Sequence, residues 1–349
     1  MALTSSFKSS TPPWVTFGAG AAAGALAAFA LLRAARPARA VPALPAFAEV
    51  VGPEAAARGA DEAAADALKA RIRGHYDDAS ASYQQLWGQH VHHGLWRPGS
   101  EGLSKEEAQL RLVEDLYARA GLARGAKVLD VGCGVGGTSV WLANRGHAVT
   151  GITLSPVQAA MAQENLARSG AAGVKVRFLV MDGEKIDFPG EDGTFDAIWI
   201  TEVLSHMPHK DRFFAHASRL LKPGGKLVLA DWFAADCVGT AAWSGVLSQI
   251  ETGMMSPIST VTSYQNLMVA ARLRPIFLED VSPFVAKTWD LSLALVSNPE
   301  TWNLARRLGA DAIAFLQAFG AMKDGYASGM FRLCMVIAEK ATPEQLASA

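Results

Sequence analysis

The chain has 349 residues, half of them apolar, so it can bury a sizeable core, and its formal net charge is −1. That balance argues against nucleic acid as a partner, because nucleic-acid binding usually requires a basic face. Three cysteines, Cys133, Cys237 and Cys334, follow no metal-ligand spacing, so they predict neither a metal site nor the disulfide framework of a small secreted domain.

Residues 1–60 differ in composition from the rest of the chain. Trp14 to Leu32 carries no charge and is rich in alanine and glycine, and about 20 apolar residues can span a bilayer. The stretch therefore predicts a membrane anchor, the apolar region of a signal cleaved after Ala38-Arg-Ala40, or an organelle transit peptide, since no acidic residue precedes Glu49. The three prolines between residues 37 and 45 argue against a buried core helix. We expect a membrane-anchored or organelle-targeted protein.

Residues 61–125 predict an N-terminal helical cap. Ala64 to Arg73 has a helical pattern. Ser104 and Glu107 form a capping box, which predicts the start of a second helix. That helix carries apolar side chains on one face at Leu110, Val113, Leu116 and Tyr117.

Residues 126–235 alternate between strand and helix patterns. Such alternation predicts an α/β fold with a doubly wound, mostly parallel, Rossmann-like sheet. The expected strands are Lys127–Val131, Ala148–Leu154, Val174–Val180, Phe195–Ile200 and Lys226–Phe233. The expected helices are Thr138–Asn144, a helix from the N-cap Ser155 to Gly170, and Asp211–Leu221.

Residues 236–349 have a looser pattern that should complete the same domain. Helices are expected at Ser263–Leu273 and Trp302–Met322, and strands at Ile276–Val281 and Phe331–Ala338. The segment between those two strands is predicted to form a C-terminal lid over the active edge of the sheet.

A glycine-rich turn follows the first strand of the predicted sheet. Asp130-x-Gly132-x-Gly134-x-Gly136 lies where open α/β sheets bind ligands, and glycines let the backbone approach a ligand closely. With Gly137 the turn also has dinucleotide-binding spacing, so spacing alone does not decide the ligand. However, the acidic residue before the glycines suits the ammonium of an amino-acid ligand. The second strand ends at Gly151–Ser155 without the carboxylate that a dinucleotide's ribose requires.

Further motifs follow the turn in order. Asp182-Gly183 comes after the third strand, where a carboxylate can accept from an adenine amino group, and Leu221–Gly225 is the turn before the fifth. Together these motifs resemble class I methyltransferases, which implies S-adenosyl-L-methionine as the cofactor. The cofactor-binding residues implied by the resemblance are Asp130, Gly132, Gly134, Gly136, Thr153, Leu154, Gln158, Asp182, Gly183 and Glu202.

Four other stretches narrow the resemblance. They are Tyr76–Trp96, Gly151–Ala159, Trp199–Pro208 and Ala321–Phe331. All are similar to the γ-tocopherol C-methyltransferase family over about Ile72 to Lys340. The resemblance implies methylation of a small apolar or aromatic acceptor, with tocopherol-like phenol C-methylation favoured, and a plastid location.

The sequence departs from that family at one place. Val203-Leu-Ser205 stands where those enzymes usually carry a small residue and a second carboxylate. The acceptor therefore stays open at this stage. One alternative is N- or S-methylation of a small polar metabolite, such as an amine, thiol or thioether. Another is a regulatory module that binds S-adenosylmethionine without turnover.

Histidines are the expected proton acceptors. A phenol or amine must lose a proton on methylation, and histidine can take it near neutral pH. We expect this catalytic role for His206, which follows the fourth strand, and for His93. The cluster of His90, His92 and His93 could hold a metal ion, but no acid with convincing spacing joins these three histidines and methyl transfer needs no metal, so no metal is expected. Side chains expected to form a cage around the donor and substrate are Tyr76, Trp87, His90 and Trp96.

Overall fold

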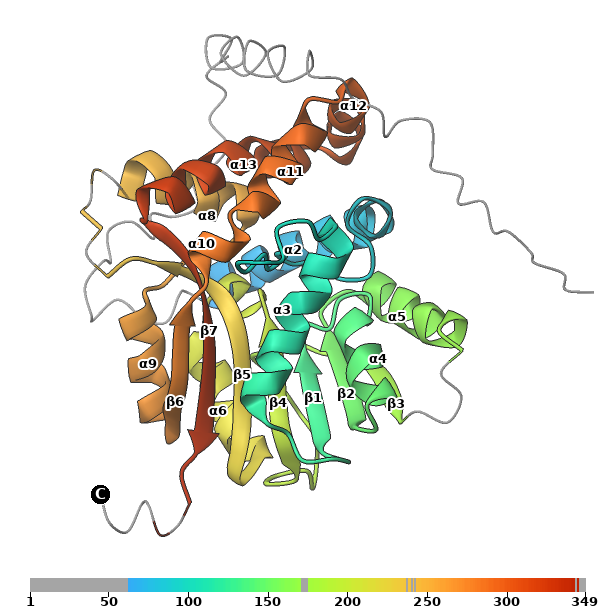
Figure 1. Ribbon diagram of the computed structural model, residues 1–349, viewed down its shortest axis with the longest axis vertical. Helices are drawn as coiled ribbons and strands as arrows, with labels where there is room; N and C mark the ends of the chain where they lie inside the picture. The colour runs from blue at the N-terminus through green and yellow to red at the C-terminus, as the bar shows by residue number, and fades with distance from the viewer. Residues whose placement is uncertain are drawn as a thin grey trace, which may run out of the picture.

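The computed structural model describes residues 62–170, 175–236, 238–239, 241, 243–342 and 344. At its centre is a seven-stranded sheet with the order β3-β2-β1-β4-β5-β7-β6 (Figure 1). The strands are β1 Lys127–Val131, β2 Ala148–Thr153, β3 Val176–Val180, β4 Phe195–Thr201, β5 Leu221–Ala234, β6 Leu273–Asp280 and β7 Phe331–Lys340. β1 to β5 pair in parallel, and β7 runs antiparallel between β5 and β6. The predicted doubly wound, mostly parallel sheet is confirmed.

Helices cover both faces of the sheet, which explains why its central strands are almost continuously buried. One apolar core joins the sheet to α3 (Lys105–Ala120) and α4 (Gly137–Asn144), and a second joins it to α6 (Lys210–Leu220) and α9 (Val261–Ala270). α5 (Pro156–Arg168) packs on β2 and β3. The capping box predicted before α3 is present, since Ser104 and Glu107 bond to each other's backbone N–H.

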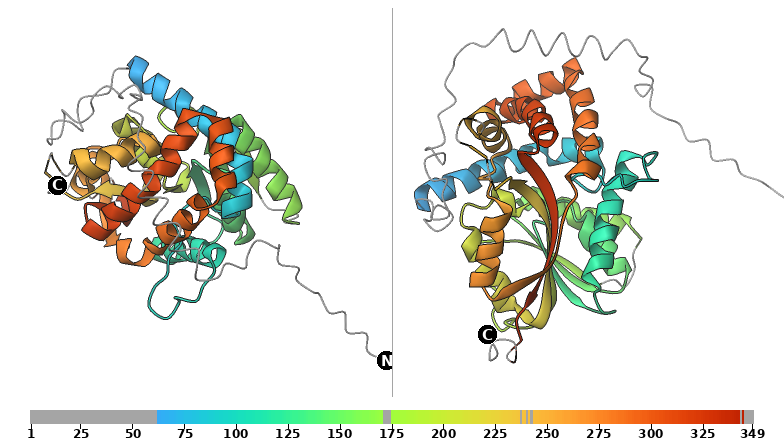
Figure 2. Two further views of the ribbon diagram at one scale, coloured as in Figure 1. Left: turned by 90° about the horizontal axis from the view of Figure 1, so that it is seen from above. Right: turned by 60° about the vertical axis from the view of Figure 1, so that its left-hand side comes forward.

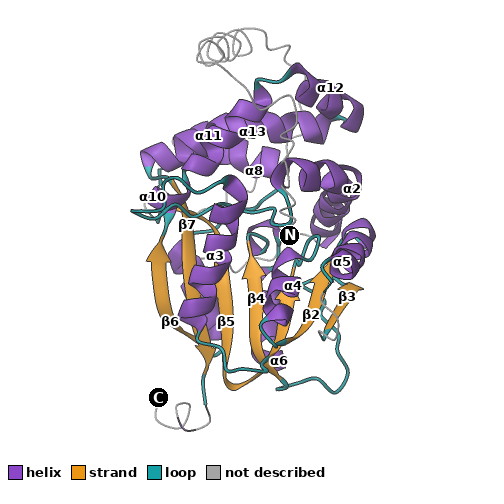
Figure 3. Cartoon of the chain, turned by 45° about the vertical axis from the view of Figure 1, so that its right-hand side comes forward, coloured by secondary structure: helices purple, strands orange, loops and turns teal. Residues whose placement is uncertain are grey.

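A third group of helices lies beyond the carboxyl ends of the parallel strands (Figures 2 and 3). It comprises α2 Glu62–Trp87, α8 Ser248–Met254, α10 Ser282–Val285, α11 Lys287–Val296, α12 Pro299–Leu308 and α13 Ala310–Ser328. The N-terminal and C-terminal members meet in an ion pair between Arg71 on α2 and Asp311 on α13, at 2.9 Å. Both ends of the chain thus help to cover the edge of the sheet where ligands bind.

The structure corrects several predicted boundaries. The first helix does not end at Arg73 but continues to Trp87, because its second half packs aromatic side chains against α13. The single helix predicted over 302–322 is broken at Gly309, whose φ of 100° and ψ of −167° only glycine adopts readily. α9 ends at Ala270 and β6 begins at Leu273, because the chain turns tightly between them.

The segment Trp14–Leu32 and Cys237 lie outside the described residues, so the anchor and targeting interpretations stay predictions. Among the helices that the structure does describe, none combines the length and the hydropathy needed to cross a bilayer.

Candidate active site

A cleft of about 1140 Å³, part of it open to solvent, lies at the carboxyl ends of the strands. Its floor consists of residues that end or follow four neighbouring parallel strands: Asp130–Val135, Thr153–Ser155, Met181–Gly183 and Thr201–Val203. Side chains of α2 and the segment Gln89–His92 line its other side. This is the position at which doubly wound sheets bind their ligands.

The glycine-rich turn after β1 packs closely on its neighbours. Gly132, Gly134 and Gly136 all have positive φ, which favours glycine. A Cβ on Gly132 would lie 2.4 Å from Val203, whereas a Cβ on Gly134 would meet no atom within 4 Å. Gly134 therefore faces open space in the cleft. Gly136 does not line the cleft: it precedes α4, and a Cβ there would lie 2.9 Å from Ala162.

Asp130 lies at the end of β1 with only 3% of its surface exposed. Ser139 donates a hydrogen bond of 2.6 Å to its Oδ2, and burial raises the pKa of Asp130 to about 6. Within the described part of the chain, no lysine or arginine forms an ion pair with this carboxylate. A ligand's ammonium group would supply the missing positive charge.

Asp182 and Gln158 mark the far side of the cleft. Asp182 accepts from the backbone N–H of Glu184 at 2.9 Å and pairs with Lys69 of α2 at 2.8 Å, so the N-terminal helix is tied to the sheet here. Thr153 Oγ1 donates to Gln158 Oε1 at 2.8 Å. Leu154 and Gly183, also predicted at this site, line the cleft as well.

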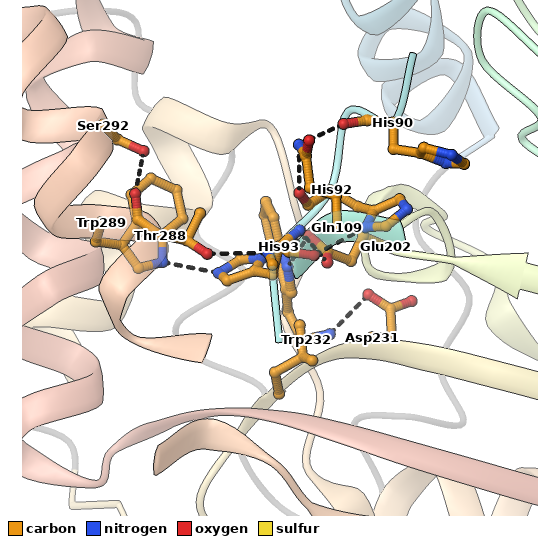
Figure 4. Close-up of polar contacts among 12 residues, drawn as sticks. His90, His92, His93, Gln109, Glu202, Asp231, Trp232, Thr288, Trp289 and Ser292 are labelled. Atoms are coloured by element: carbon orange, nitrogen blue, oxygen red, sulfur yellow. Dashed lines mark hydrogen bonds and ion pairs between the residues drawn. The ribbon is translucent and has the colours of Figure 1, made fainter. Parts of the chain in front are cut away.

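Glu202, the first residue after β4, is held by neutral donors (Figure 4). The backbone N–H of His93 donates to Oε1 at 2.8 Å, and His93 Nδ1 lies 2.7 Å from Oε2. The indole of Trp232 on β5 donates to the same Oε2 at 2.9 Å. Glu202 lines the cleft, but both of its oxygens already accept hydrogen bonds from the protein.

The other ring nitrogen of His93 faces α11. Trp289 Nε1 donates to His93 Nε2 at 2.8 Å, and the Tyr326 hydroxyl lies 3.2 Å from the same atom. An indole N–H can only donate, so Nε2 must accept and Nδ1 must carry the proton of a neutral ring. No ring nitrogen remains free to remove a proton from an acceptor. This corrects the base role predicted for His93, which instead holds Glu202 in place.

His206 lies in η3 (Leu204–His206), the short turn after β4. Its Nδ1 lies 2.9 Å from Ser256 Oγ and 3.3 Å from the carbonyl oxygen of Met255. Because that carbonyl can only accept, Nδ1 carries the proton and Nε2 keeps its lone pair. Burial lowers the pKa of His206 to about 4, so the ring is neutral near pH 7. His206 therefore presents a neutral ring with a free acceptor nitrogen at the junction of the cleft and the second cavity described below.

A second cavity of about 560 Å³, also partly open to solvent, adjoins the cleft and is mainly aromatic and apolar. The residues that line both cavities are Tyr76, Val91, His92, Glu202 and His206. The residues that line only the second cavity are Tyr83, Trp87, His93, Trp232, Met254, Thr288, Trp289 and Phe315. An apolar acceptor seated there would reach the donor cleft beside His206.

The predicted cage residues are thus separated. Tyr76 lines both cavities, His90 lines the donor cleft and Trp87 lines the aromatic cavity. Trp96 is not among the described residues that line either one. Its indole N–H donates to the carbonyl of Leu103 at 3.0 Å, so Trp96 supports the loop before α3.

The site also depends on residues that the sequence motifs did not reveal. Ser139 lies in the first turn of α4, shortly after the glycine-rich turn. A hydroxyl at that position is the local signal that could have indicated its hydrogen bond to Asp130. Trp289 is 196 positions from His93, so no local pattern indicates their contact. Buried Lys210 donates to the carbonyls of Met207 at 2.8 Å and Pro257 at 2.6 Å, which fixes the turn that carries His206. Burial lowers the pKa of Lys210 to about 8.

Within the described residues, no group of three or more histidine, cysteine, aspartate or glutamate side chains is arranged to hold a metal ion. Two of the clustered histidines, His90 and His92, do lie close together, with ring centres 5.3 Å apart, but they belong to no such group.

Comparison with known proteins agrees with this geometry. Residues 129–229 match the family model described as a methyltransferase domain. The chloroplastic tocopherol O-methyltransferase of Arabidopsis thaliana is 32% identical over 79% of this chain and 83% of its own. A probable chloroplastic tocopherol O-methyltransferase of Oryza sativa is 30% identical over 78% of both chains.

Among solved structures, geranyl diphosphate C-methyltransferase from Streptomyces coelicolor, in complex with S-adenosyl-L-homocysteine, shares the fold. Its TM-score is 0.62 at 22% identity, over 78% of this chain and 98% of that one.

Fold and matches together define a class I methyltransferase that uses S-adenosyl-L-methionine. Within that class, the chain belongs to the tocopherol O-methyltransferase family, to which it is similar over most of its length. The residues present fit the cofactor: the glycine-rich turn opens to the cleft at Gly134, Asp130 is a buried carboxylate without a lysine or arginine partner among the described residues, and Asp182 lines the far side of the same cleft.

Proposed function

We propose that this enzyme methylates a phenol that carries an apolar tail, at the ring carbon next to the hydroxyl. The observation that carries the proposal is the aromatic cavity beside the donor cleft, with His206 and Tyr76 lining both. Trp87, Trp289 and Phe315 offer apolar and aromatic surface for a ring and its tail. Relatives named for tocopherol and for 2-methyl-6-phytyl-1,4-hydroquinone support this acceptor class.

The reaction needs a base but no metal ion. The bound cofactor supplies an already activated methyl group, so the protein must mainly orient the acceptor and exclude water. As the new C–C bond forms and the C–S bond breaks, the phenol hydroxyl gives up its proton. The ring carbon later loses its hydrogen, the hydroxyl is restored, and one proton is released overall. We assign Nε2 of His206 as the acceptor of this proton. Its lone pair is free because the proton on Nδ1 faces Met255 and Ser256.

The helices that partly cover the site support the same chemistry. α2 and α13 meet over the sheet edge, and the aromatic rings of Tyr83 and Phe315 lie 5.6 Å apart, centre to centre. This cover spans part of the cleft, which is elsewhere open to solvent, and so reduces the access of water to the reacting groups. It also leaves an aromatic wall against which a hydrocarbon tail can pack.

The test is a panel of acceptors incubated with the purified full-length enzyme and labelled donor. It contains a long-tailed phenol, the methyl ether of that phenol, and a primary amine with the same tail. We expect only the phenol to be methylated, and mass spectrometry and NMR should show a product with a free hydroxyl and a methylated ring carbon. Methylation at the phenol oxygen would refute transfer to the ring carbon. Methylation of the amine alone would overturn the whole proposal.

A variant of the cavity sharpens this test. Phe315→Ala should lower kcat/KM for the long-tailed phenol by roughly 10- to 100-fold, because burying one large apolar side chain is worth about 1.5–3 kcal/mol. A short phenol should be affected less. Val269→Ala is the matched control, because Val269 lies on α9 and is 64% exposed.

We further propose that residues 1–60 are a plastid-targeting segment. The early serines, later arginines and absence of acidic residues before Glu49 support this, as do two relatives named as chloroplastic. Mature protein isolated from its source should begin well after Leu32. Full-length protein that stays in membranes after carbonate washing would instead identify Trp14–Leu32 as an anchor.

A further inference from the structure

Two of the carboxylates that line the donor cleft, Asp130 and Glu202, are buried. Asp130 accepts one hydrogen bond, from the hydroxyl of Ser139, and Glu202 accepts three, all from neutral groups. Asp182, by contrast, is paired with Lys69. Across the described ranges, no lysine or arginine forms an ion pair with Asp130 or Glu202.

Glu202 is held in its charged form. Its surface is only 8% exposed, and three N–H groups point at its two oxygens. A buried, ionised carboxylate among neutral donors is costly unless a cation joins it.

The backbone at Glu202 is also in an unusual conformation. Its φ of 54° lies in the left-handed region, which a residue with a long side chain rarely adopts. The next residue, Val203, packs against Gly132, so the turns after β1 and β4 are in contact. Strain of this kind persists where function requires a fixed side-chain position. Here it directs Glu202 into the space shared by the two cavities.

S-adenosyl-L-methionine has two cationic centres, an ammonium and a sulfonium. Asp130 is the expected partner of the ammonium. We propose that Glu202 supplies the compensating charge for the sulfonium, so that the cleft binds the charged donor more tightly than the neutral thioether that remains after transfer. Glu202 is then a specificity residue that distinguishes donor from spent cofactor. The inference rests on the cofactor and is independent of the acceptor proposed above.

The sulfur of the cofactor loses its positive charge on methyl transfer, and Glu202 can therefore favour release of the product. When the methyl group leaves, the sulfur becomes neutral and the favourable interaction with Glu202 ends. His93, Trp232 and Trp289 still hold the carboxylate where it is, so it cannot turn toward solvent. The carboxylate is left without a cation, which favours exchange of the product for fresh donor.

The test measures binding by calorimetry on the full-length protein with no acceptor present. The ligands are S-adenosylmethionine, sinefungin, which carries an ammonium group in place of the methylated sulfonium, and S-adenosylhomocysteine, which is neutral there. Glu202→Gln should weaken binding of the two cationic ligands by about 10- to 100-fold and that of S-adenosylhomocysteine by less than about threefold. Asp182→Asn is the matched control and should weaken all three alike, because all share the adenosyl group.

Equal losses for all three ligands in Glu202→Gln, or no loss for any, would overturn the proposal. If that variant does not fold, Glu202→Asp replaces it, since it keeps the charge but withdraws it by one methylene. It must reduce the preference for the cationic ligands, and an unchanged preference would refute the inference. Trp232→Phe removes one neutral donor and leaves the charge, so the preference should survive. Failure of the enzyme to methylate phenols would not affect any of these measurements.

Discussion

Replacing Asp130 with asparagine should have opposite effects on donor affinity and on the stability of the free protein. Asp130 is buried, and the Ser139 hydroxyl is its one side-chain hydrogen-bond partner among the described residues. Asparagine keeps an oxygen for that hydroxyl but removes the charge that should meet the donor's ammonium. Loss of a charge-assisted hydrogen bond costs roughly 1–3 kcal/mol, so the Kd for S-adenosylmethionine should rise by about 5- to 150-fold.

The free protein should instead become more stable. Burial raises the pKa of Asp130 from 3.8 to about 6, which at about 1.36 kcal/mol per pH unit corresponds to roughly 3 kcal/mol. Because the folded-state pKa is the higher one, stability from this group is present at low pH and is lost as pH rises from about 4 through 6. At pH 7, Asp130→Asn should therefore raise the free energy of unfolding by up to about 3 kcal/mol, measured by urea unfolding without ligand.

Donor affinity should also depend on pH. Only ionised Asp130 attracts the ammonium, so wild-type affinity should fall about tenfold for each pH unit below about 6 and level off above it. Calorimetry between pH 5 and 7.5 measures this, and Asp130→Asn should lack the slope. A variant that binds the donor normally, or a wild type with no such slope, would refute the place assigned to Asp130.

Other predictions concern the base, the adenine contact, the buried lysine and the N-terminal segment. His206→Ala should lower kcat by about 10²–10⁴ with donor affinity nearly intact, and a near-normal rate would exclude the base role. Because the pKa of His206 is about 4, its contribution to the wild-type rate should be flat between pH 5.5 and 8. Asp182→Ala should weaken donor binding by about 1–3 kcal/mol in calorimetry, and unchanged affinity would contradict the adenine contact. Lys210→Met should destabilise the fold by about 1–3 kcal/mol in urea unfolding, because it leaves the buried carbonyls of Met207 and Pro257 without their donor, and an unchanged free energy of unfolding would argue against that role. A chain beginning at Asp61 should bind donor like the full-length protein, and loss of binding would give residues 1–60 a part in the site.

The parts of the fold that follow local rules were predictable. The strand before Asp130 is a short apolar run, and the glycines after it form a turn at the expected edge of the sheet. The capping box at Ser104 fixes the start of α3 through contacts three residues apart. Such signals act within one or two turns of the chain, so they can be read without knowing the tertiary structure.

The site's polar network was not predictable in the same way. His93 and His206 look equivalent in the sequence. In the structure, Trp289 donates to Nε2 of His93, whereas no described residue forms a hydrogen bond with Nε2 of His206. The partner of His93 comes from a helix 196 positions away, and Lys69 is 113 positions from Asp182. These pairings depend on how α2 and α11 fold over the sheet, which local patterns do not encode.

A crystal structure of the full-length protein with S-adenosylhomocysteine and a long-tailed phenol tests the central claim most directly. The account predicts the ligand's amino group on Asp130, its adenine beside Asp182, and the phenol ring in the aromatic cavity with its hydroxyl on Nε2 of His206. A phenol bound outside that cavity, or an adenosyl ligand away from the glycine-rich turn, would contradict it.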